Sequence, residues 1–389
     1  MQRPPLPVSG AWRVGDPVAQ RKFVTMATDR PLMLEGGGRL RDVTLAYETW
    51  GRLADDGSNA ILLCHAWTGD AHVVGPMGPG QPTAGWWEGI VGPGCPIDTD
   101  RWFVVCANVL GGCQGSSGPA SLDPATGRPF GSAFPVVTIR DMVRTQAVLA
   151  DRLGVRRWAS VVGGSMGGMQ VLEWAVTFPD RVRSILPIAT CAQSTAQQIG
   201  WGAIGRRAIK LDPGFHGGDY YDAASGEGPH TGLMIARMIA QITFRSDDVF
   251  TDRFGRQLAD GGSAPERFDL WQRFEIERYL DYHGEKLVRR FDANSYCVIG
   301  KAMDLHDVGR GRGGLQSAMA RIRVPTMSIG IHSDVLYPSY QQRQIVQLLR
   351  DAGTPAEYVE IDSPHGHDSF LIDLDQVGAA ITRFLEHLA

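Results

Sequence analysis

The sequence has little of several features that mark particular classes of protein. Its formal net charge at pH 7 is only −4 over 389 residues, so it lacks the basic excess that attracts nucleic acid or an anionic membrane. No apolar run approaches the roughly 20 residues needed to span a bilayer. Its first residues, MQRPPLPVSGAWRVGDP, contain no continuous apolar segment of the kind found in secretory signals. We therefore expect no nucleic-acid partner, no membrane association and a cytoplasmic location.

Metal-binding patterns are also missing. None of the six cysteines belongs to a C-x-x-C pair, the spacing of many structural zinc sites. Cys64 and Cys106 lie in short apolar runs, as expected for reduced, buried thiols of a cytoplasmic enzyme. The segment HGHD near the C-terminus lacks the H-x-H-x-D spacing of metallo-hydrolases, and no H-E-x-x-H occurs. We expect no metal site.

Short apolar runs rich in valine and isoleucine alternate with helical patterns. The pattern over 138–154, for example, places apolar residues on one side of a helix and ends at a glycine, and 340–353 and 375–389 are similar. Such alternation predicts an α/β fold with a mostly parallel sheet covered by helices on both faces. The predicted strands are residues 60–64, 102–109, 158–162, 184–189, 325–331 and 356–361.

The alternation stops between residues 192 and 322. This stretch is poor in strand patterns and rich in helical ones, and its segment RQLADGGSAPERFD (256–269) is expected to be a mobile loop. We predict an N-terminal tail (1–30), a core (31–191 and 323–389) and a helical lid insertion (192–322). The lid should cover the carboxyl edge of the sheet, where ligands of open α/β sheets bind.

Ser165 stands in a G-x-S-x-G motif between a predicted strand and a predicted helix. Gly163 and Gly167 would allow the sharp strand-to-helix turn of a nucleophile elbow, with the serine hydroxyl exposed above the sheet. The Met166 amide, at the helix N-terminus, would face a developing oxyanion. A phosphate loop fits worse, because G-x-G-x-x-G would need glycine at 165 and no G-x-x-x-x-G-K-[ST] occurs. A tight turn with an idle serine is the remaining alternative.

A nucleophile elbow predicts an acid and then a histidine further along the chain. Asp334 follows the predicted strand 325–331, and His367 follows the next strand. Asp304 and Asp307 compete for the acid role, but they lie in the predicted lid. His365 competes for the histidine role, although its proline and glycine neighbours suggest that it shapes the loop.

The second oxyanion donor should come from the loop after an early strand. Strand 60–64 runs into HAWTG, so the backbone amide of Trp67 would act together with that of Met166. His65, at the start of this loop, is expected to anchor the loop and to take no part in the chemistry.

Many further motifs occur in a fixed order, and together they identify a family. From about Leu32 to the C-terminus, the chain resembles the homoserine O-acetyltransferases, which are acyltransferases with the α/β-hydrolase fold. The resemblance implies transfer of an acetyl group from acetyl-CoA to the hydroxyl of L-homoserine, in methionine biosynthesis, with no bound cofactor. The motifs are LAYETWGRL, CHAWTGDAH, GWWEGIVGPG, ANVLGGCQGSSGP, GGSMGGMQVLEWA, GLMIARMIA, RFDANSYCVI, AMDLHDVGRG and SPHGHDSFL.

The resemblance also implies roles for individual residues. Ser165 matches the family's nucleophile, Asp334 its acid and His367 its histidine, in a ping-pong reaction through an acyl-serine. Arg237 matches the arginine that binds the amino-acid carboxylate, and Asp368 matches the acidic residue that holds the ammonium group. On pattern alone, an arginine on an amphipathic helix is a solvated residue. The family is typically a homodimer built through its helical insertion.

One departure keeps other functions open. Trp67 stands where the family usually has leucine, and its larger side chain would change the shape of the acyl or acceptor pocket. Transfer from succinyl-CoA and acylation of serine are therefore alternatives, followed by an esterase or thioesterase and by a catalytically silent binding protein. The arginine-rich segments IGRRAI and GRGRGG are candidates for contacts with the CoA phosphates.

Overall fold

The computed structural model describes residues 4–259 and 268–387. Most of the loop expected at 256–269 therefore lies outside the described residues. In the part of the chain that is described, no helix is both long and apolar enough to cross a membrane.

The centre of the molecule is one eight-stranded sheet. Its strand order is β1-β4-β8-β5-β9-β10-β11-β12. All neighbours from β8 to β12 pair in parallel, whereas β4 pairs antiparallel with β8 and with β1. The strands are β1 (Lys22–Met26), β4 (Val43–Trp50), β5 (Ala60–Cys64), β8 (Phe103–Ala107), β9 (Ser160–Gly164), β10 (Ile185–Ile188), β11 (Thr326–Ile331) and β12 (Ala356–Ile361).

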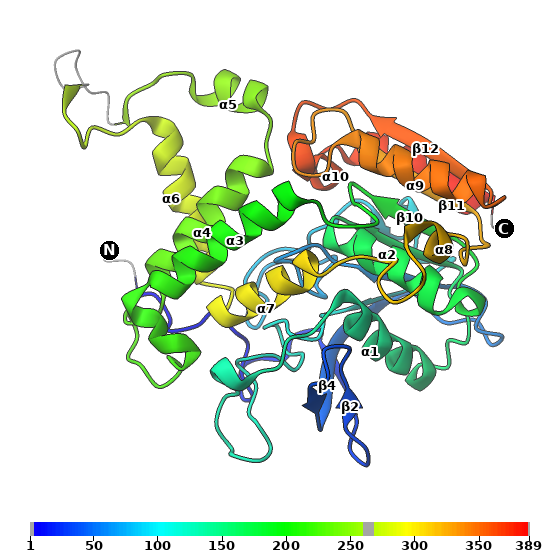
Figure 1. The fold of residues 1–389 in the computed structure, drawn as a ribbon, viewed down its shortest axis with the longest axis horizontal. Helices are drawn as coiled ribbons and strands as arrows, with labels where there is room; N and C mark the ends of the chain where they lie inside the picture. Colours follow the sequence, from blue (N-terminus) through cyan, green and yellow to red (C-terminus); the bar gives the residue numbers. More distant parts are fainter. Residues whose placement is uncertain (1–3, 260–267, 388–389) are drawn as a thin grey trace.

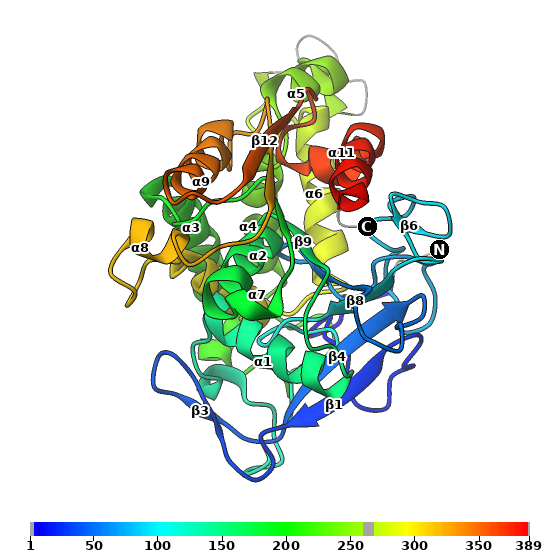
Figure 2. The same ribbon diagram turned by 90° about the vertical axis from the view of Figure 1, so that its right-hand side faces the viewer.

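Helices cover both faces of this sheet, as Figure 2 shows. Alternate residues of a strand point to opposite faces, so Leu62 packs in the apolar layer beneath α1, α2 and α9, whereas Ile61 and Leu63 pack in the layer beneath α11. The predicted α/β fold class is thereby confirmed. The covering helices are α1 (Ile139–Arg152), α2 (Met166–Thr177), α9 (Ser339–Asp351) and α11 (Leu374–Glu386).

All six predicted strands are present in the central sheet, but two of its strands, β1 and β4, were missed. The two-residue strands β2 (Leu32–Met33), β3 (Arg39–Leu40), β6 (Val91–Gly92) and β7 (Ile97–Asp98), which form two small separate sheets, were also not predicted. In β4, buried residues alternate with partly exposed ones, so it lacks the continuous apolar run that identified the buried strands. β1 lies inside the segment predicted as a tail, and it pairs with β4 from Lys22 to Met26. Even before this strand, the Gly10 amide donates to the Phe291 carbonyl at 3.2 Å. Describing residues 1–30 as a tail was therefore wrong.

Between β10 and β11 the chain forms a layer of helices beside the carboxyl edge of the sheet (Figure 1). Gly232 lets α4 approach α3 closely, because a Cβ there would lie 2.6 Å from the Ala208 carbonyl oxygen. Gly284 does the same where α6 packs on α4. We call residues 192–322, as far as the structure describes them, the lid. The helices of its layer are α3 (Ala196–Leu211), α4 (His230–Thr243), α5 (Asp247–Phe254), α6 (Glu275–Val288) and α7 (Ala293–Asp304). The last helix before β11, α8 (Leu315–Met319), lies apart from this layer and packs against α9 of the core.

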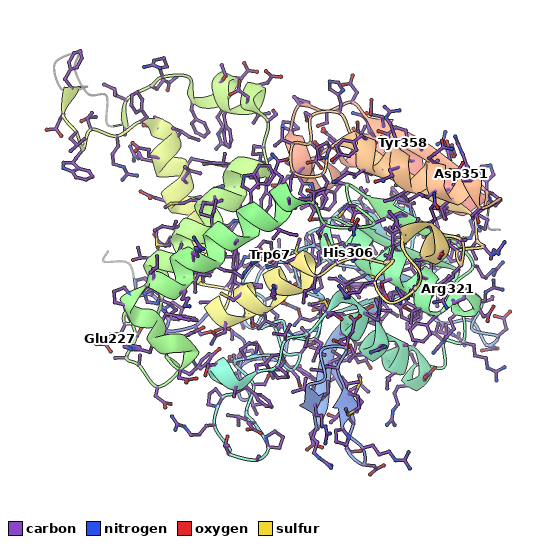
Figure 3. All side chains as sticks on the ribbon, viewed as in Figure 1. Trp67, Glu227, His306, Arg321, Asp351 and Tyr358 are labelled. Carbon is purple, nitrogen blue, oxygen red and sulfur yellow. The ribbon has the colours of Figure 1, made fainter. Side chains whose placement is uncertain are left out.

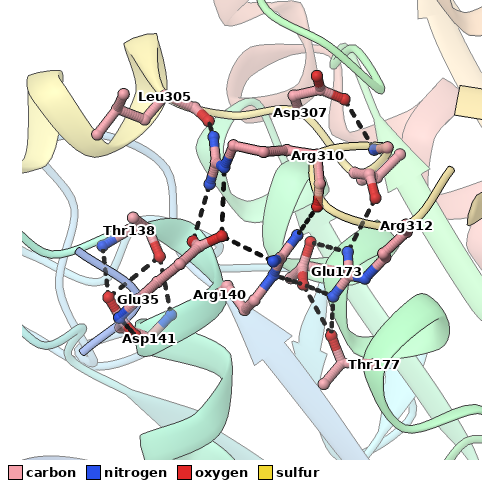
Figure 4. Close-up of polar contacts among 12 residues, drawn as sticks. Glu35, Thr138, Arg140, Asp141, Glu173, Thr177, Leu305, Asp307, Arg310 and Arg312 are labelled. Atoms are coloured by element: carbon pink, nitrogen blue, oxygen red, sulfur yellow. Dashed lines mark hydrogen bonds and ion pairs between the residues drawn. The ribbon is translucent and has the colours of Figure 1, made fainter. Parts of the chain in front are cut away.

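A buried network of ion pairs fastens the end of the lid to the core (Figure 4). Glu173 of α2 pairs with Arg312 of the lid and, at 2.9 Å, with Arg140 of α1. Arg310 pairs with Glu35 at 2.8 Å. The arginines of GRGRGG are therefore engaged in structural ion pairs, which argues against their suggested role as contacts for CoA phosphates.

Replacing Glu173 by glutamine should destabilise the fold strongly. The side chain is 3% exposed. Loss of its charge would leave the buried Arg312 guanidinium without its carboxylate partner, and Arg140 with Glu35 alone. We expect the free energy of unfolding to fall by about 3–5 kcal/mol, measured by denaturant titration. Glu357→Gln is the matched control: its pair with Arg383 is half exposed, so its loss should cost less than about 1 kcal/mol. Equal losses of unfolding free energy in Glu173→Gln and Glu357→Gln would show that the buried ion pairs of Glu173 stabilise the fold no more than an exposed pair.

Candidate active site

The turn between β9 and α2 has the geometry of a nucleophile elbow. Ser165 adopts φ 57° and ψ −123°, a conformation that non-glycine residues rarely take and that often marks functional positions. Neighbouring groups hold the strained backbone at both ends. The Ser165 amide donates to the Ile188 carbonyl at 2.9 Å, and the Thr190 hydroxyl donates to the Ser165 carbonyl at 2.8 Å.

The glycines around Ser165 are required by close contacts. A Cβ at Gly167 would lie 2.0 Å from the Cys64 carbonyl oxygen, and one at Gly163 would lie 2.7 Å from the Gly167 carbonyl carbon. Gly164 packs under the ring of Phe370, and Gly168 packs under the Thr190 side chain. The first two therefore make the turn possible, and the other two allow neighbouring side chains to approach it.

Asp334 and His367 meet beside the elbow. The His367 Nδ1 lies 2.7 Å from Asp334 Oδ2, and both side chains are buried. The other carboxylate oxygen of Asp334 accepts the amides of Leu336 and Tyr337, each at 2.8 Å. The acid is therefore held by its own loop, and it fixes the imidazole with Nε2 available for chemistry.

The charge of Asp334 also affects the basicity of His367. Burial of the imidazole by itself lowers its pKa, but the Asp334 carboxylate at hydrogen-bond distance, helped by Asp368, raises the pKa above its ordinary value. The rings of Phe244, Tyr337 and Phe370 surround the histidine. Such apolar surroundings limit solvent screening of the ion pair.

The loop after β5 presents the second expected oxyanion donor. Within the described residues, neither the Trp67 amide nor the Met166 amide donates to a protein acceptor, so both are free for an incoming oxygen. The loop turns tightly, with the Gly69 amide donating to the Ala66 carbonyl at 2.7 Å and with Thr68 at φ 48°. We call residues 65–69 the oxyanion loop.

His65 anchors this loop, as the sequence analysis expected. Its Nδ1 lies 2.9 Å from the Ala66 carbonyl, and its Nε2 accepts the Val109 amide at 3.2 Å. Burial lowers the pKa of the imidazole, which favours the neutral ring that this pair of hydrogen bonds requires. Both ring nitrogens are thus engaged in holding the backbone.

One cavity joins the elbow to the lid. Ser165, His367 and Trp67 line it from the core, and Arg237 and Asp304 are among the residues that line it from the lid. Asp368, next to the histidine in the chain, also lines it. Five of the seven predicted site residues therefore line one cavity, as expected for ligands that bind between an α/β core and a covering domain. The other two, Asp334 and Met166, do not line it: Asp334 lies behind His367 as its hydrogen-bond partner, and Met166 follows Ser165 at the start of α2.

Arg237 and Asp368 differ in how far they are already occupied. No carboxylate in the described chain lies within ion-pair distance of Arg237, whose guanidinium stacks 5.1 Å from the Phe244 ring. Burial lowers the pKa of this guanidinium, and the Asp368 charge opposes the effect. Asp368 itself pairs with Arg245 at 3.4 Å. Among the described residues, no carboxylate therefore pairs with Arg237, whereas Asp368 is already paired with Arg245.

The competing acids and histidine have other partners or positions. Asp304 lines the cavity but pairs with Arg206, and Asp307 accepts from Gln193 and from the Gly309 amide. His365 lines a separate cavity between α5, α6 and the turn before His367. Among the residues that we considered from the sequence, only Asp334 contacts His367.

The Trp67 side chain extends from the core to the lid. Its ring packs 4.3 Å from the ring of Tyr296, and a Cβ at Gly300 of α7 would lie 3.0 Å from it. Figure 3 labels Trp67 beside α7. The indole thus forms part of the cavity wall where core and lid meet. Trp67 stands where the family usually has leucine. Any effect of this difference on the acyl or acceptor pocket would arise at this part of the cavity wall.

Arg290 was not predicted from the sequence, although it lines the same cavity from the turn between α6 and α7. Its guanidinium donates to the Thr68 carbonyl at 2.8 Å and lies 3.4 Å from the Thr68 hydroxyl. It opens the motif RFDANSYCVI, but nothing in the local pattern separates it from the other arginines of the lid.

The sheet, the elbow and the buried Asp–His pair together define a class. A family model described as the alpha/beta hydrolase fold matches residues 59–374, and the chain belongs to this class of proteins with a serine elbow. Curated relatives define the particular family. A homoserine O-acetyltransferase from Thermobifida fusca is 54% identical over 98% of both chains, and one from Symbiobacterium thermophilum is 53% identical over 95% of this chain and 96% of the relative. The chain belongs to the homoserine O-acetyltransferase family, as the resemblance predicted.

Solved structures show the same fold in proteins with different names. The homoserine O-acetyltransferase from Bacillus anthracis superposes with a TM-score of 0.86 at 28% identity, covering 94% of this chain and 97% of that one. Esterase E22 superposes with a TM-score of 0.85 at 28% identity, covering 94% and 99%. Because an esterase has nearly the same architecture, the fold by itself does not separate transfer from hydrolysis.

Proposed function

We propose that this protein transfers the acetyl group of acetyl-CoA to the hydroxyl of L-homoserine. The observation that carries the proposal is the shared cavity: Ser165 and His367 line its core side, and Arg237, which pairs with no carboxylate of the described chain, lines its lid side. An amino-acid acceptor has a carboxylate for such an arginine. The family relationship, at about half of all positions over the whole chain, supports the same reaction.

The first half-reaction acylates the enzyme. His367, oriented by Asp334, accepts the Ser165 hydroxyl proton as the Ser165 Oγ attacks the thioester carbonyl. The amides of Trp67 and Met166 stabilise the oxyanion of the tetrahedral intermediate. When the intermediate collapses, the C–S bond breaks and the proton on His367 passes to the CoA sulfur. Free CoA and acetyl-Ser165 result.

The second half-reaction uses the same groups in the reverse direction. Arg237 binds the homoserine carboxylate and Asp368 its ammonium group, which places the acceptor hydroxyl near the acyl carbon. His367 takes the hydroxyl proton, the new ester bond forms, and Ser165 leaves with the proton that His367 returns. The lid encloses this step, so the positioned hydroxyl competes with water for the acyl-enzyme.

Initial-rate kinetics should show a ping-pong mechanism. Double-reciprocal plots for acetyl-CoA at several homoserine concentrations should be parallel, because CoA leaves before the acceptor reacts. Mass spectrometry of enzyme quenched without homoserine should find a single acetyl group on Ser165. Intersecting lines, or the absence of acyl-Ser165, would contradict the mechanism.

A grid of donors and acceptors decides between the alternatives. Rates with acetyl-CoA or succinyl-CoA, each with homoserine or serine, should be highest for acetyl-CoA with homoserine. The similarity of the fold to esterase E22 makes hydrolysis the second candidate. An esterase or thioesterase would release CoA at full rate without an amino acid, whereas the transferase should release it slowly.

We also propose that the protein is a cytoplasmic homodimer built through the lid. Large apolar side chains stand exposed on adjoining lid helices, which is typical of surfaces that bind another chain. All six cysteines are unpaired thiols, as expected in a reducing compartment. Light scattering coupled to size-exclusion chromatography tests the dimer. The exposed side chains are Ile204 of α3, Ile235 and Ile242 of α4, and Tyr282 of α6.

A further inference from the structure

We infer that Arg290 is a positioning residue: from the lid, it holds the oxyanion loop in the conformation that acyl transfer requires. The inference rests on the proposed function only in that an oxyanion forms at Ser165. Its basis is the contact between the Arg290 guanidinium and Thr68, the residue that follows the Trp67 amide in the chain.

The oxyanion loop needs such a support at this end. Thr68 has φ 48°, a region that a β-branched residue seldom adopts without help from its surroundings. His65 fixes the beginning of the loop through the Ala66 carbonyl and the Val109 amide, but it does not contact Thr68. Arg290 supplies the second attachment, with Nη1 2.8 Å from the Thr68 carbonyl and Nη2 3.4 Å from its hydroxyl.

Arg290 is itself held firmly. Its carbonyl accepts the Gln114 side-chain amide at 2.7 Å, and its amide donates to the Leu287 carbonyl at 3.0 Å. Gln114 in turn accepts from Arg21 at 3.0 Å. The guanidinium thus sits at the end of a chain of hydrogen bonds that joins the N-terminal segment, the core and the lid. A preorganised support of this kind is what keeps oxyanion donors in place during the reaction.

Neighbouring charges act on Arg290 in opposite directions. Burial and the neighbouring Arg237 guanidinium lower the pKa of Arg290, whereas the carboxylate of Asp70, two residues beyond Thr68, raises it. The Asp70 carboxylate also accepts the His72 amide at 2.9 Å. Asp70 directly follows the oxyanion loop, so its carboxylate favours the charged form of Arg290 from beside the contact with Thr68.

The two arginines in the cavity consequently have different tasks. Within the part of the chain that the structure describes, Arg237 pairs with no carboxylate, so it remains available to bind the acceptor. The terminal nitrogens of Arg290 are directed at Thr68, so this residue should influence the oxyanion in both half-reactions without setting the affinity for homoserine.

The test compares Arg290→Met with Arg290→Lys. For each, the rate of Ser165 acylation by p-nitrophenyl acetate is measured without acceptor, and kcat and KM for homoserine are measured with acetyl-CoA. In Arg290→Met, acylation and kcat should fall together by about 10²-fold, while KM for homoserine changes less than about threefold. Arg290→Lys, which keeps the charge and one donor, should recover part of both rates. Arg289→Met is the control, because Arg289 pairs with Glu285 outside the cavity, and it should retain full activity.

Three results would overturn the inference. A large rise in KM for homoserine with unchanged acylation would make Arg290 an acceptor-binding residue. Normal acylation and transfer in Arg290→Met would show that the loop needs no such support, and equal losses in the Met and Lys variants with a matching loss of thermal stability would show a purely structural role. If Arg290→Met does not fold, Arg290→Lys alone tests the inference: its kcat should fall by a larger factor than its KM for homoserine changes. Because the acylation of Ser165 is measured without homoserine, a failure of the proposed transfer to homoserine can be distinguished from a failure of this inference.

Discussion

Ser165→Ala should lower kcat for acetyl transfer by at least about 10⁴-fold and leave the fold intact. The side chain is buried at the floor of the cavity, but no protein group hydrogen-bonds to its hydroxyl in the described structure, so its loss breaks no structural contact. Alanine also meets the same backbone cost as serine at φ 57°. The elbow should therefore keep its shape without its nucleophile.

The measurement pairs activity with stability. CoA release is followed with a thiol reagent, and the free energy of unfolding of the variant should stay within about 1 kcal/mol of the parent. Ser328→Ala provides the control, because Ser328 is a buried serine of β11 that does not line the cavity, and it should keep full activity. Residual transfer within tenfold of the parent rate would show that an acyl-Ser165 is not an obligatory intermediate.

The elbow was predictable because its requirements are local. A strand, a glycine-flanked serine and a helix follow one another within a few residues, and the steric limits at Gly163 and Gly167 leave few other residues possible there. The acid and histidine were found by their order in the chain and by their places after consecutive strands. Parallel pairing of β11 with β12 then brings the ends of those strands, and hence Asp334 and His367, together.

The parts that the sequence did not yield depend on contacts between distant segments. β1 lies in a Pro-rich, Gly-rich N-terminal region and becomes a strand only because β4 offers a pairing edge. Arg245 reaches Asp368, and Arg290 reaches Thr68, across more than 100 and 200 positions respectively. An arginine on a lid segment has the same local pattern whether it binds a loop, a carboxylate or water, so only the fold separates these roles.

Asp334→Asn should lower the maximal rate by about 10⁴-fold and also move its pH dependence. His367 accepts a proton only when it is neutral, so activity is lost as the pH falls through its pKa, which Asp334 raises above the ordinary value. Asparagine removes that charge while burial still opposes protonation, so the acidic limb of kcat/KM should shift to lower pH. The side-chain Nδ2 of the introduced asparagine, facing the His367 ring, would donate to Nδ1 and force it to accept. The ring proton would then lie on Nε2, the nitrogen that has to act as base.

Asp307→Asn is the control: it changes a carboxylate bound to Gln193 and should alter neither the maximal rate nor its pH dependence. A limb that stays in place in Asp334→Asn would mean that another group sets the protonation of the base, whereas the expected shift, combined with the large loss of rate, ties both effects to the one hydrogen bond of 2.7 Å.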